Sequence, residues 1–305
     1  MPCGGMAEWS KAPVLKTDES RGSQGSNPCP SATLLCDLSP ACEFLVSEST
    51  LPESTPLDIL YEDDYLFAVN KPAGLLVHPS WIAPARTPNL VSLLKERYPG
   101  ETIHTVHRLD RATSGVILFA RNKTVTQQLQ AQFVERRIQK TYLCVVRGWP
   151  DEAGVIDYAL KPIHDKHAEP HANPDKEPKE AVSAFRRIAT VSLPIPISRY
   201  PEARYSLVEV KLSTGRKHQI RRHMRHIMHP LVGDTTHGEG RHNRLFRDHF
   251  DSHRLLLMAV GLEFVHPVTD TVIKIEAGVG EDVEQLFGQL GWHEGYPVTA
   301  SVTQR

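Results

Sequence analysis

The 305-residue sequence has few cysteines and no long hydrophobic run. Its 5 cysteines include no C-x-x-C pair, and all but Cys144 lie in the first 42 residues. This arrangement matches neither a zinc module nor a disulfide framework, so we expect an intracellular, reducing and specifically cytoplasmic setting. No run approaches the roughly 18 apolar residues that cross a bilayer. The first residues also lack the pattern of a secretory signal, so no membrane partner is expected.

Several motifs of cofactor and metal chemistry are also missing. There is no G-x-x-x-x-G-K-[ST] phosphate loop and no dinucleotide-binding fingerprint, so we expect no dinucleotide or other cofactor. His218, His223, His226 and His229 cluster in the sequence, but no H-E-x-x-H motif and no carboxylate occurs in their predicted helix. A metal site is therefore not expected, although a His-rich metallohydrolase is one alternative that the sequence leaves open.

The chain also has almost no net charge, with 35 Lys+Arg, 36 Asp+Glu and a net charge of -1. That value averages unlike segments. Residues 1–56 carry a net charge of -4, whereas residues 103–147 carry +6 and residues 213–254 carry +5. Two basic blocks can present a basic surface to phosphates, although charge alone fits a solvated surface equally well.

Composition divides the chain into parts. Residues 1–56 are rich in Ser, Pro, Gly and Thr without apolar periodicity, which predicts a disordered extension, or a start codon assigned too early. Residues 57–292 have the patterns of a folded domain, and residues 293–305 are a C-terminal tail. Within the domain, the polar and Pro-rich residues 161–180 predict a long exposed loop.

The folded part mixes strands and helices without a regular alternation, which favours an α+β fold over a doubly wound one. Apolar runs predict two short strands around the turn 62–64, a buried strand at 116–120 and a strand at 141–149. They also predict a strand at 203–215 and a final strand pair at 255–267 and 271–278. Helical spacing predicts helices at 89–98, 124–136, 217–228 and 281–290, with Asn89 as the cap of the first and Thr124 near that of the second.

Asp110 is the strongest candidate for chemistry. It follows His107-Arg108-Leu109 and precedes Arg111, in a loop between two predicted strands. Flanking arginines would keep its carboxylate ionised, which suits a nucleophile or a base. An isolated Asp in such a loop more often serves only to fix a turn.

A second candidate is Thr214-Gly215-Arg216-Lys217-His218-Gln219-Ile220-Arg221. A glycine turn that opens a helix with Arg, Lys and His in its first turn can bind phosphate, although a solvated cationic face is equally possible. Tyr142, at the start of a predicted strand, can stack on a base or pack in the core.

Four motifs in order change this balance. NKPAGLLVHP, HRLDRATSG, KTYLCVVRG and LSTGRKHQIRRHMRHIMHPLVGD resemble those of the RluA-type pseudouridine synthases, over roughly residues 57–292. The resemblance implies a pseudouridine synthase catalytic fold, with a mixed, mostly antiparallel sheet and flanking helices and loops around a central RNA-binding cleft. It also implies an isomerase that needs no cofactor.

The same resemblance implies roles for individual residues. Asp110 is the catalytic carboxylate, Arg221 is its basic partner, and Tyr142 stacks on the uracil and helps to remove its C5 proton. Ile220 lies under the ring, and Arg108 enters the stack after the target base flips out. Phosphate contacts are expected from four further residues: Arg111, Arg216, Lys217 and His218.

Within the family, residues 198–210, Arg221-Arg222 and residues 238–250 are most similar to members that modify uridine 65 of tRNA. We therefore expect structured RNA, first of all tRNA, as the partner of a monomeric enzyme. A ribosomal RNA target is the alternative within the family, and a non-catalytic RNA-binding protein is the alternative outside it.

Overall fold

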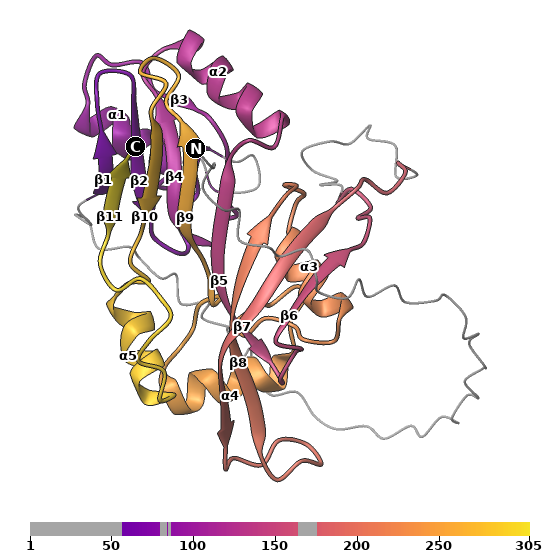
Figure 1. Ribbon diagram of the computed structural model, residues 1–305. Helices are drawn as coiled ribbons and strands as arrows, with labels where there is room; N and C mark the ends of the chain where they lie inside the picture. The colour runs from indigo at the N-terminus through magenta and orange to yellow at the C-terminus, as the bar shows by residue number, and fades with distance from the viewer. Residues whose placement is uncertain (1–56, 80–83, 85–86, 164–175) are drawn as a thin grey trace, which may run out of the picture. The chain divides into compact units, whose positions relative to one another are not determined.

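The computed structural model describes residues 57–79, 84, 87–163 and 176–305. Over these residues a single sheet is flanked by helices (Figure 1). Its strands are β1 (Asp58–Glu62), β2 (Leu66–Lys71), β3 (His104–Thr105), β4 (Ser114–Ala120), β5 (Gln139–Arg147), β6 (Ala153–Asp157), β7 (Val182–Leu193), β8 (Ala203–Leu212), β9 (Leu257–Val265), β10 (Val272–Glu276) and β11 (Ser301–Gln304). The helices are α1 (Leu90–Arg97), α2 (Lys123–Val134), α3 (Gln219–His226), α4 (Gly240–Phe250) and α5 (Glu281–Gln289).

The 11-stranded sheet of the described residues has the order β1-β2-β4-β9-β5-β8-β7-β6, with β10 and β11 continuing from β9 and β3 pairing with β4. Every strand pair is antiparallel except β4 with β9. This confirms the predicted α+β class with a mixed, mostly antiparallel sheet.

Around β2 and β4 the sheet is buried on both faces. All seven residues of β4 are buried, as its β-branched run predicts. One face packs against α1 through Leu90 and Leu94, and the other against α2 through Val125 and Leu129. Asn89 caps α1 as predicted, by accepting a hydrogen bond of 3.0 Å from the backbone N–H of Ser92.

Around β5 and β8 the sheet is covered by the other helices. Ile220 and Met224 of α3 pack against one cluster with Cys144 and Val208. On the opposite face, Phe246 of α4 and Phe287 of α5 enter a second cluster with Tyr205 of β8. α5 coincides with the helix predicted at 281–290 to within one residue, and its Val283, Leu286 and Phe287 are buried.

The two parts meet at the parallel contact of β4 with β9, where Gly115 faces Ala259. Gly115 has a φ of 111°, and a Cβ there would lie 2.1 Å from the backbone oxygen of Ala259. Only glycine fits this close approach without strain. The contact fixes the loop before β4, which contains Asp110, beside β9 and its neighbour β5.

Some predictions were wrong or incomplete. The cap of α2 is Asn122, whose side chain accepts from the N–H of Val125; Thr124 lies two residues beyond this cap, near it as predicted. The helix predicted at 217–228 is shorter in the structure: α3 ends at His226, and Met228 beyond it is 69% exposed. Strands β3, β6 and β7 and helix α4 were not predicted.

The predicted end of the domain at residue 292 does not end the sheet, because β11 lies in 293–305 and pairs with β10. The predicted disordered extension at 1–56 lies outside the described residues, as does most of the predicted loop at 161–180.

A candidate active site around Asp110

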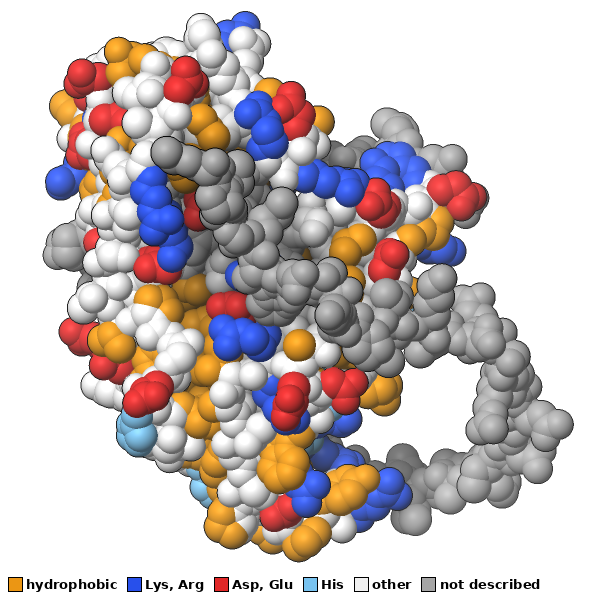
Figure 2. Space-filling model, viewed as in Figure 1, with side chains coloured by type: hydrophobic (Ala, Val, Ile, Leu, Met, Phe, Trp, Pro, Cys, Tyr) orange, Lys and Arg blue, Asp and Glu red, His pale blue; other side chains and the backbone are white. Residues whose placement is uncertain are grey.

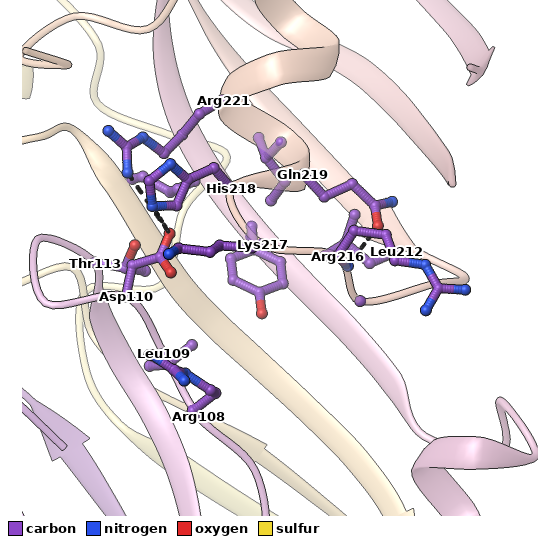
Figure 3. A pocket seen from close by; sticks show the side chains of 14 residues that line it. Arg108, Leu109, Asp110, Thr113, Leu212, Arg216, Lys217, His218, Gln219 and Arg221 are labelled. Atoms are coloured by element: carbon purple, nitrogen blue, oxygen red, sulfur yellow. Dashed lines mark hydrogen bonds and ion pairs between the residues drawn. The ribbon is translucent and has the colours of Figure 1, made fainter. Parts of the chain in front are cut away.

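A cavity of about 220 Å³ opens where the loop before β4, the strand β5 and the start of α3 come together. It brings together residues that lie more than 100 positions apart in the sequence. Of the residues predicted from the sequence, the following line it: Arg108, Asp110, Tyr142, Arg216, Lys217, His218, Ile220 and Arg221. Figure 3 shows Asp110 facing His218 and Arg221 across this space.

Asp110 lies in a tight turn that is attached to its surroundings through the backbone. Its carbonyl accepts from the N–H of Thr113 at 3.1 Å, and the carbonyl of Arg111 accepts from the N–H of Gly74 at 2.8 Å. The Asp110 side chain is 25% exposed, so its carboxylate faces the cavity but remains in contact with the protein. The structure thus shows the turn that the sequence offered as one alternative, and it leaves the Asp110 carboxylate at the cavity.

Arg221 connects Asp110 to a buried ion pair. Its Nη1 lies 3.7 Å from Oδ2 of Asp110, while its Nε and Nη2 each donate to Asp234 at 2.7 Å. Asp234 also accepts from the backbone N–H groups of Thr236 and His237, at 2.9 and 2.8 Å. A bidentate pair with a fully buried carboxylate fixes the plane of the guanidinium, so that its free edge faces Asp110.

Electrostatics keep this cluster ionised. Burial by itself lowers the pKa of Arg221, but its hydrogen bonds to Asp234 and the charges of Asp234 and Asp110 raise the pKa above its ordinary value. Burial likewise acts to raise the pKa of Asp234, and the hydrogen bonds from Arg221 and from the backbone hold it below the ordinary range. Arg221 therefore presents a permanent positive charge to Asp110.

His218 is the second neighbour of Asp110, with its Nε2 at 3.7 Å from Oδ2. Its Nδ1 is hydrogen-bonded to Nε2 of His237 at 2.9 Å. Burial lowers the pKa of His218 to about 4, against the opposing charge of Asp110. The lowered pKa favours the neutral ring, in which His218 can still form hydrogen bonds, and the phosphate contact expected for it stays a prediction.

Tyr142 and Ile220 supply the apolar surface of the cavity. Tyr142 of β5 packs against the clusters on both sides of the parallel contact, and Ile220 of α3 is 4% exposed. Burial, followed by the charge of Asp110, raises the pKa of the Tyr142 phenol, so it stays protonated. The cavity thus combines a flat aromatic ring with a carboxylate, a geometry that suits a planar base attached to a sugar.

The remaining predicted cations differ in where they point. Lys217 is exposed and extends toward Asp110 in Figure 3, whereas Arg216 turns away, its Nε donating to the carbonyl of Glu180 at 2.9 Å. Arg108 is exposed at the edge of the cavity. Arg111 does not line the cavity, because its Nε donates to the carbonyl of Gly74 at 2.8 Å.

Two residues of the site lie in motifs quoted above but received no role there. One is Asp234, the partner of Arg221. The other is Lys71, which is fully buried and whose Nζ donates to the carbonyls of Pro72, Leu75 and Arg111 at 2.8, 2.9 and 3.1 Å. Lys71 thereby ties the NKPAG loop to the turn of Asp110. Burial lowers its pKa to about 7, and the charge of Asp110 acts in the opposite direction.

The four histidines considered for a metal diverge. His223 is bonded to the hydroxyl of Ser183 and the carbonyl of Tyr158, and His229 to the carbonyl of Arg147. His226 stacks on the ring of Tyr158 with the ring centroids 3.8 Å apart. Each of these side chains, and His218 beside Asp110, therefore has protein partners of its own, and the four do not converge on one point.

Comparison with known proteins shows the family to which the chain belongs. The model of a family described as RNA pseudouridylate synthase matches residues 65–226, which include Asp110, Tyr142 and Arg221. The chain belongs to this RNA pseudouridylate synthase family. The resemblance drawn from the four motifs is thereby confirmed, and the enzyme is an isomerase of the pseudouridine synthase class.

This pseudouridylate synthase has close curated relatives. It is 48% identical over 238 residues to a protein of Vibrio parahaemolyticus named tRNA pseudouridine synthase C, covering 78% of this chain and 96% of the relative. It is 45% identical over 253 residues to a protein of the same name from Yersinia pestis, covering 80% and 98%.

Solved structures share its fold. Human RNA Pseudouridylate Synthase Domain Containing 4 superposes with a TM-score of 0.59 at 22% identity, covering 78% of this chain and 94% of that one. Human RNA Pseudouridylate Synthase Domain Containing 1 gives a TM-score of 0.57 at 24% identity, covering 79% and 97%. No helix among the described residues of the synthase is long and apolar enough to cross a membrane.

Proposed function

We propose that this pseudouridine synthase acts on tRNA, converting uridine 65 to pseudouridine, with Asp110 as its catalytic carboxylate. The tRNA substrate is supported by the name of relatives at 44–48% identity, tRNA pseudouridine synthase C. The position is supported by the similarity of residues 198–210 and 238–250 to members that modify uridine 65. The activity is assigned to the folded part of the chain, whose sheet runs from β1 to β11.

The reaction rearranges atoms without adding any. The bond from N1 of uracil to C1′ of ribose breaks, the ring turns, and C5 forms the new bond to C1′. The proton leaves C5 and N1 gains one, so substrate and product are isomers. Neither electrons nor external energy are needed, which supports catalysis by side chains alone.

The observation that carries the proposal is Asp110, 3.7 Å from a guanidinium that Asp234 holds in a fixed plane. The carboxylate of Asp110 lines the cavity, with its Oδ2 toward this guanidinium. It can then attack C1′ as the uracil leaves, or remove a ribose proton so that a glycal forms; the geometry fits both routes. As the uracil leaves, negative charge grows on the ring, and Arg221 contributes a positive charge at the same end of the cavity.

Binding places the uridine in this cavity. Uridine in a helical stem presents no open path to C1′, so the base must flip out, at a cost of a few kcal/mol of unstacking. Tyr142 with its protonated phenol stacks on the flipped ring above Ile220, and Arg108 at the cavity edge fills the space left in the RNA. The raised pKa of the Tyr142 phenol favours a stacking role for Tyr142 over removal of the C5 proton.

The RNA around the flipped uridine is bound through its backbone. Arg111, Arg216 and Lys217 contact phosphates, and His218 adds a hydrogen bond. As expected from the sequence, we take the enzyme to be a monomer that acts in the cytoplasm, where tRNA is modified.

The test is release of tritium from tRNA labelled at C5 of uridine, since C5 loses its hydrogen only when the new bond forms. Asp110→Asn should lower the rate by about 10⁴-fold or more while leaving tRNA affinity within a few-fold, because only the nucleophile or base is lost. Asp64→Asn, which changes an exposed carboxylate in the turn between β1 and β2, is the matched control and should retain full activity.

Substantial tritium release by Asp110→Asn would remove Asp110 from the chemistry. Release from ribosomal RNA but not from tRNA would contradict the tRNA substrate, and modification mapped to a uridine other than 65 would contradict the position. A wild-type protein that binds RNA but releases no tritium would be a binding protein, and activity abolished by a chelator would indicate a metallohydrolase.

A further inference from the structure

A second basic surface lies away from the cavity, on helix α4. Its sequence, GRHNRLFRDHF, places Arg241, Arg244 and Arg247 three residues apart, so they share one side of the helix. The opposite side carries Asn243 and Phe246, which are buried. The sequence therefore builds an amphipathic helix whose outer side is made of arginines.

These arginines line a groove with the connection between β7 and β8. Pro196, Ile197 and Ser198 of that connection form its other wall. Nη1 of Arg241 donates to the hydroxyl of Ser198 at 2.8 Å, which fixes the two walls together. We call this surface, formed by residues 196–198 with Arg241, Arg244 and Arg247, the α4 groove.

The charges of the α4 groove are not neutralised within the described residues. Arg241, Arg244 and Arg247 are exposed, and none of them forms an ion pair with any residue that the structure describes. The nearby acids have other partners: Glu239 pairs with Arg147 and His242, and Glu202 pairs with Arg204. Asp248 lies on the exposed side of α4 and offsets one of the three charges, which leaves a net positive groove.

Exposed aromatic rings lie at the end of the sheet where β7 connects to β8, since Trp149 donates to the carbonyl of Val191 in β7. Tyr200, 55% exposed, lies in the connection next to Ser198, and its ring is covered by the guanidinium of Arg199 at 5.2 Å from the centroid. Trp149, 42% exposed, carries the guanidinium of Arg204 at 4.5 Å. Arginines interleaved with exposed aromatics are typical of surfaces that bind the phosphates and bases of RNA. Figure 2 shows Lys, Arg and hydrophobic side chains side by side at its lower end, where Figure 1 places the tips of β7 and β8.

The groove and the cavity are at opposite ends of β8. Leu212 lines the cavity, and Ala203 at the other end borders the connection. The 10 residues of this strand span about 30 Å at roughly 3.3 Å per residue. A nucleotide in the cavity therefore cannot also reach the α4 groove.

The two sites are nevertheless joined rigidly by α4. Asn243, on its inner side, donates to the carbonyl of Asp234 at 2.9 Å and accepts from the N–H of Gly233 at 2.8 Å. Asp234 in turn holds Arg221 beside Asp110. The helix that presents the three arginines thus also fixes the turn that orients the catalytic cluster.

From this geometry we propose that the α4 groove binds the sugar–phosphate backbone of the substrate RNA at a distance of about 30 Å from the flipped uridine. This inference rests on the proposed function, because it takes the RNA in the cavity and the RNA in the groove to be one molecule. It explains how an enzyme with a small cavity selects a large folded RNA. Two binding surfaces at a fixed separation can be occupied together only by an RNA whose shape places a phosphate backbone at that distance from the flipped uridine.

The experiment compares a full-length tRNA transcript with a short stem-loop that carries the target uridine. Arg241→Ala/Arg244→Ala/Arg247→Ala should raise the Kd for full-length tRNA about tenfold or more at 0.15 M salt, and should lower the salt slope of binding by about 2–3. Its Kd and kcat for the stem-loop should match the wild type. Lys95→Ala/Arg97→Ala on α1, which removes two exposed cations elsewhere, is the control and should leave both Kd values unchanged.

The triple Arg→Lys variant should restore most of the affinity if charge is what the groove supplies. Unchanged full-length binding by the triple Ala variant would overturn the inference, and so would an equal loss on both RNAs. Thermal unfolding of each variant verifies the fold. A wild-type enzyme that modifies neither RNA would refute the proposed function instead, so the two failures are distinguishable.

Discussion

The cavity and the α4 groove use the same residue type in opposite ways. In the cavity, Arg221 has a side chain 7% exposed, donates two hydrogen bonds to Asp234, and faces Asp110 with its remaining edge. In the groove, Arg244 and Arg247 are exposed and have no ion-pair partner among the described residues. Arg221 is therefore held in one orientation by the protein, whereas the side chains of Arg244 and Arg247 are exposed to solvent.

This difference has energetic consequences. A buried guanidinium is costly unless its partner stays in place, so the geometry around Arg221 is coupled to the stability of the fold. An exposed guanidinium remains hydrated, and removing it affects stability little but affects a salt-dependent association. Substitutions in the cavity should therefore change the free energy of unfolding and kcat, and substitutions in the groove should change the affinity for RNA.

The largest effect is expected from Asp234→Asn. The amide keeps the size of the side chain but removes the close partner of the buried Arg221 charge and leaves it only the 3.7 Å contact with Asp110, which should cost about 3–5 kcal/mol of unfolding free energy. Arg221 also loses its fixed plane, so kcat should fall about 100-fold with a smaller change in KM. Urea unfolding and single-turnover kinetics measure the two effects.

Asp282→Asn is the matched control for this substitution. Asp282 also pairs with an arginine, Arg254, at 3.0 Å, but its side chain is 59% exposed. This pair should contribute under about 1 kcal/mol. Equal losses from Asp234→Asn and Asp282→Asn would show that burial does not separate the two kinds of pair.

A smaller effect is expected from Lys71, whose charge is buried without an acid in contact. Its pKa is lowered to about 7, so above pH 7 the folded state holds fewer protons here than the unfolded state, whose lysine titrates near 10.5. The penalty for the buried charge is therefore complete below pH 7 and is relieved as pH rises toward 10.5. The stability of the wild type relative to Lys71→Met should rise across this window, by up to about 1.4 kcal/mol per pH unit.

The comparison with Lys71→Met is needed because Lys140, with a pKa lowered by burial to about 8, titrates in the same window in both proteins. Chemical unfolding at pH 6, 8 and 10 supplies the difference. A difference that is constant with pH would mean that Lys71 keeps its proton throughout, and that its three carbonyl contacts outweigh burial.

How far the sequence predicts this molecule depends on where each residue finds its partners. Strand β4, helix α1 and helix α5 follow from local apolar patterns and a local cap, and all three are observed. Strand β7 and helix α4 do not. β7 has two adjacent arginines, Arg186 and Arg187, within an otherwise irregular apolar and polar pattern, and it pairs with β8. α4 buries an asparagine whose partners are Gly233 and Asp234.

In the candidate site too, the sequence predicts individual residues better than it predicts their contacts with distant partners. The motifs predict the residues that line the cavity, since Asp110, Tyr142 and Arg221 all lie there. They do not reveal that Asp234 rather than Asp110 is the closer partner of Arg221, nor that Lys71 bonds to the carbonyl of Arg111, 40 residues away. Such contacts depend on how strands and loops are brought together, which a local pattern does not contain.

The smallest effect is expected where both partners are exposed. Arg136 and Glu180 form two hydrogen bonds, of 3.0 and 2.6 Å, with side chains 46% and 54% exposed. Glu180→Gln should leave Tm unchanged at 0.15 M salt, because hydration replaces what the pair supplies. The substitution keeps the backbone carbonyl of residue 180, which accepts a hydrogen bond from Arg216. It removes the negative charge of the Glu180 side chain next to Arg216, a cation that lines the cavity. The affinity for RNA should therefore stay equal or rise slightly at low salt. A clear fall in the Tm of Glu180→Gln would contradict the prediction. It would show that the geometry of an ion pair, as well as its burial, decides how much the pair stabilises this protein.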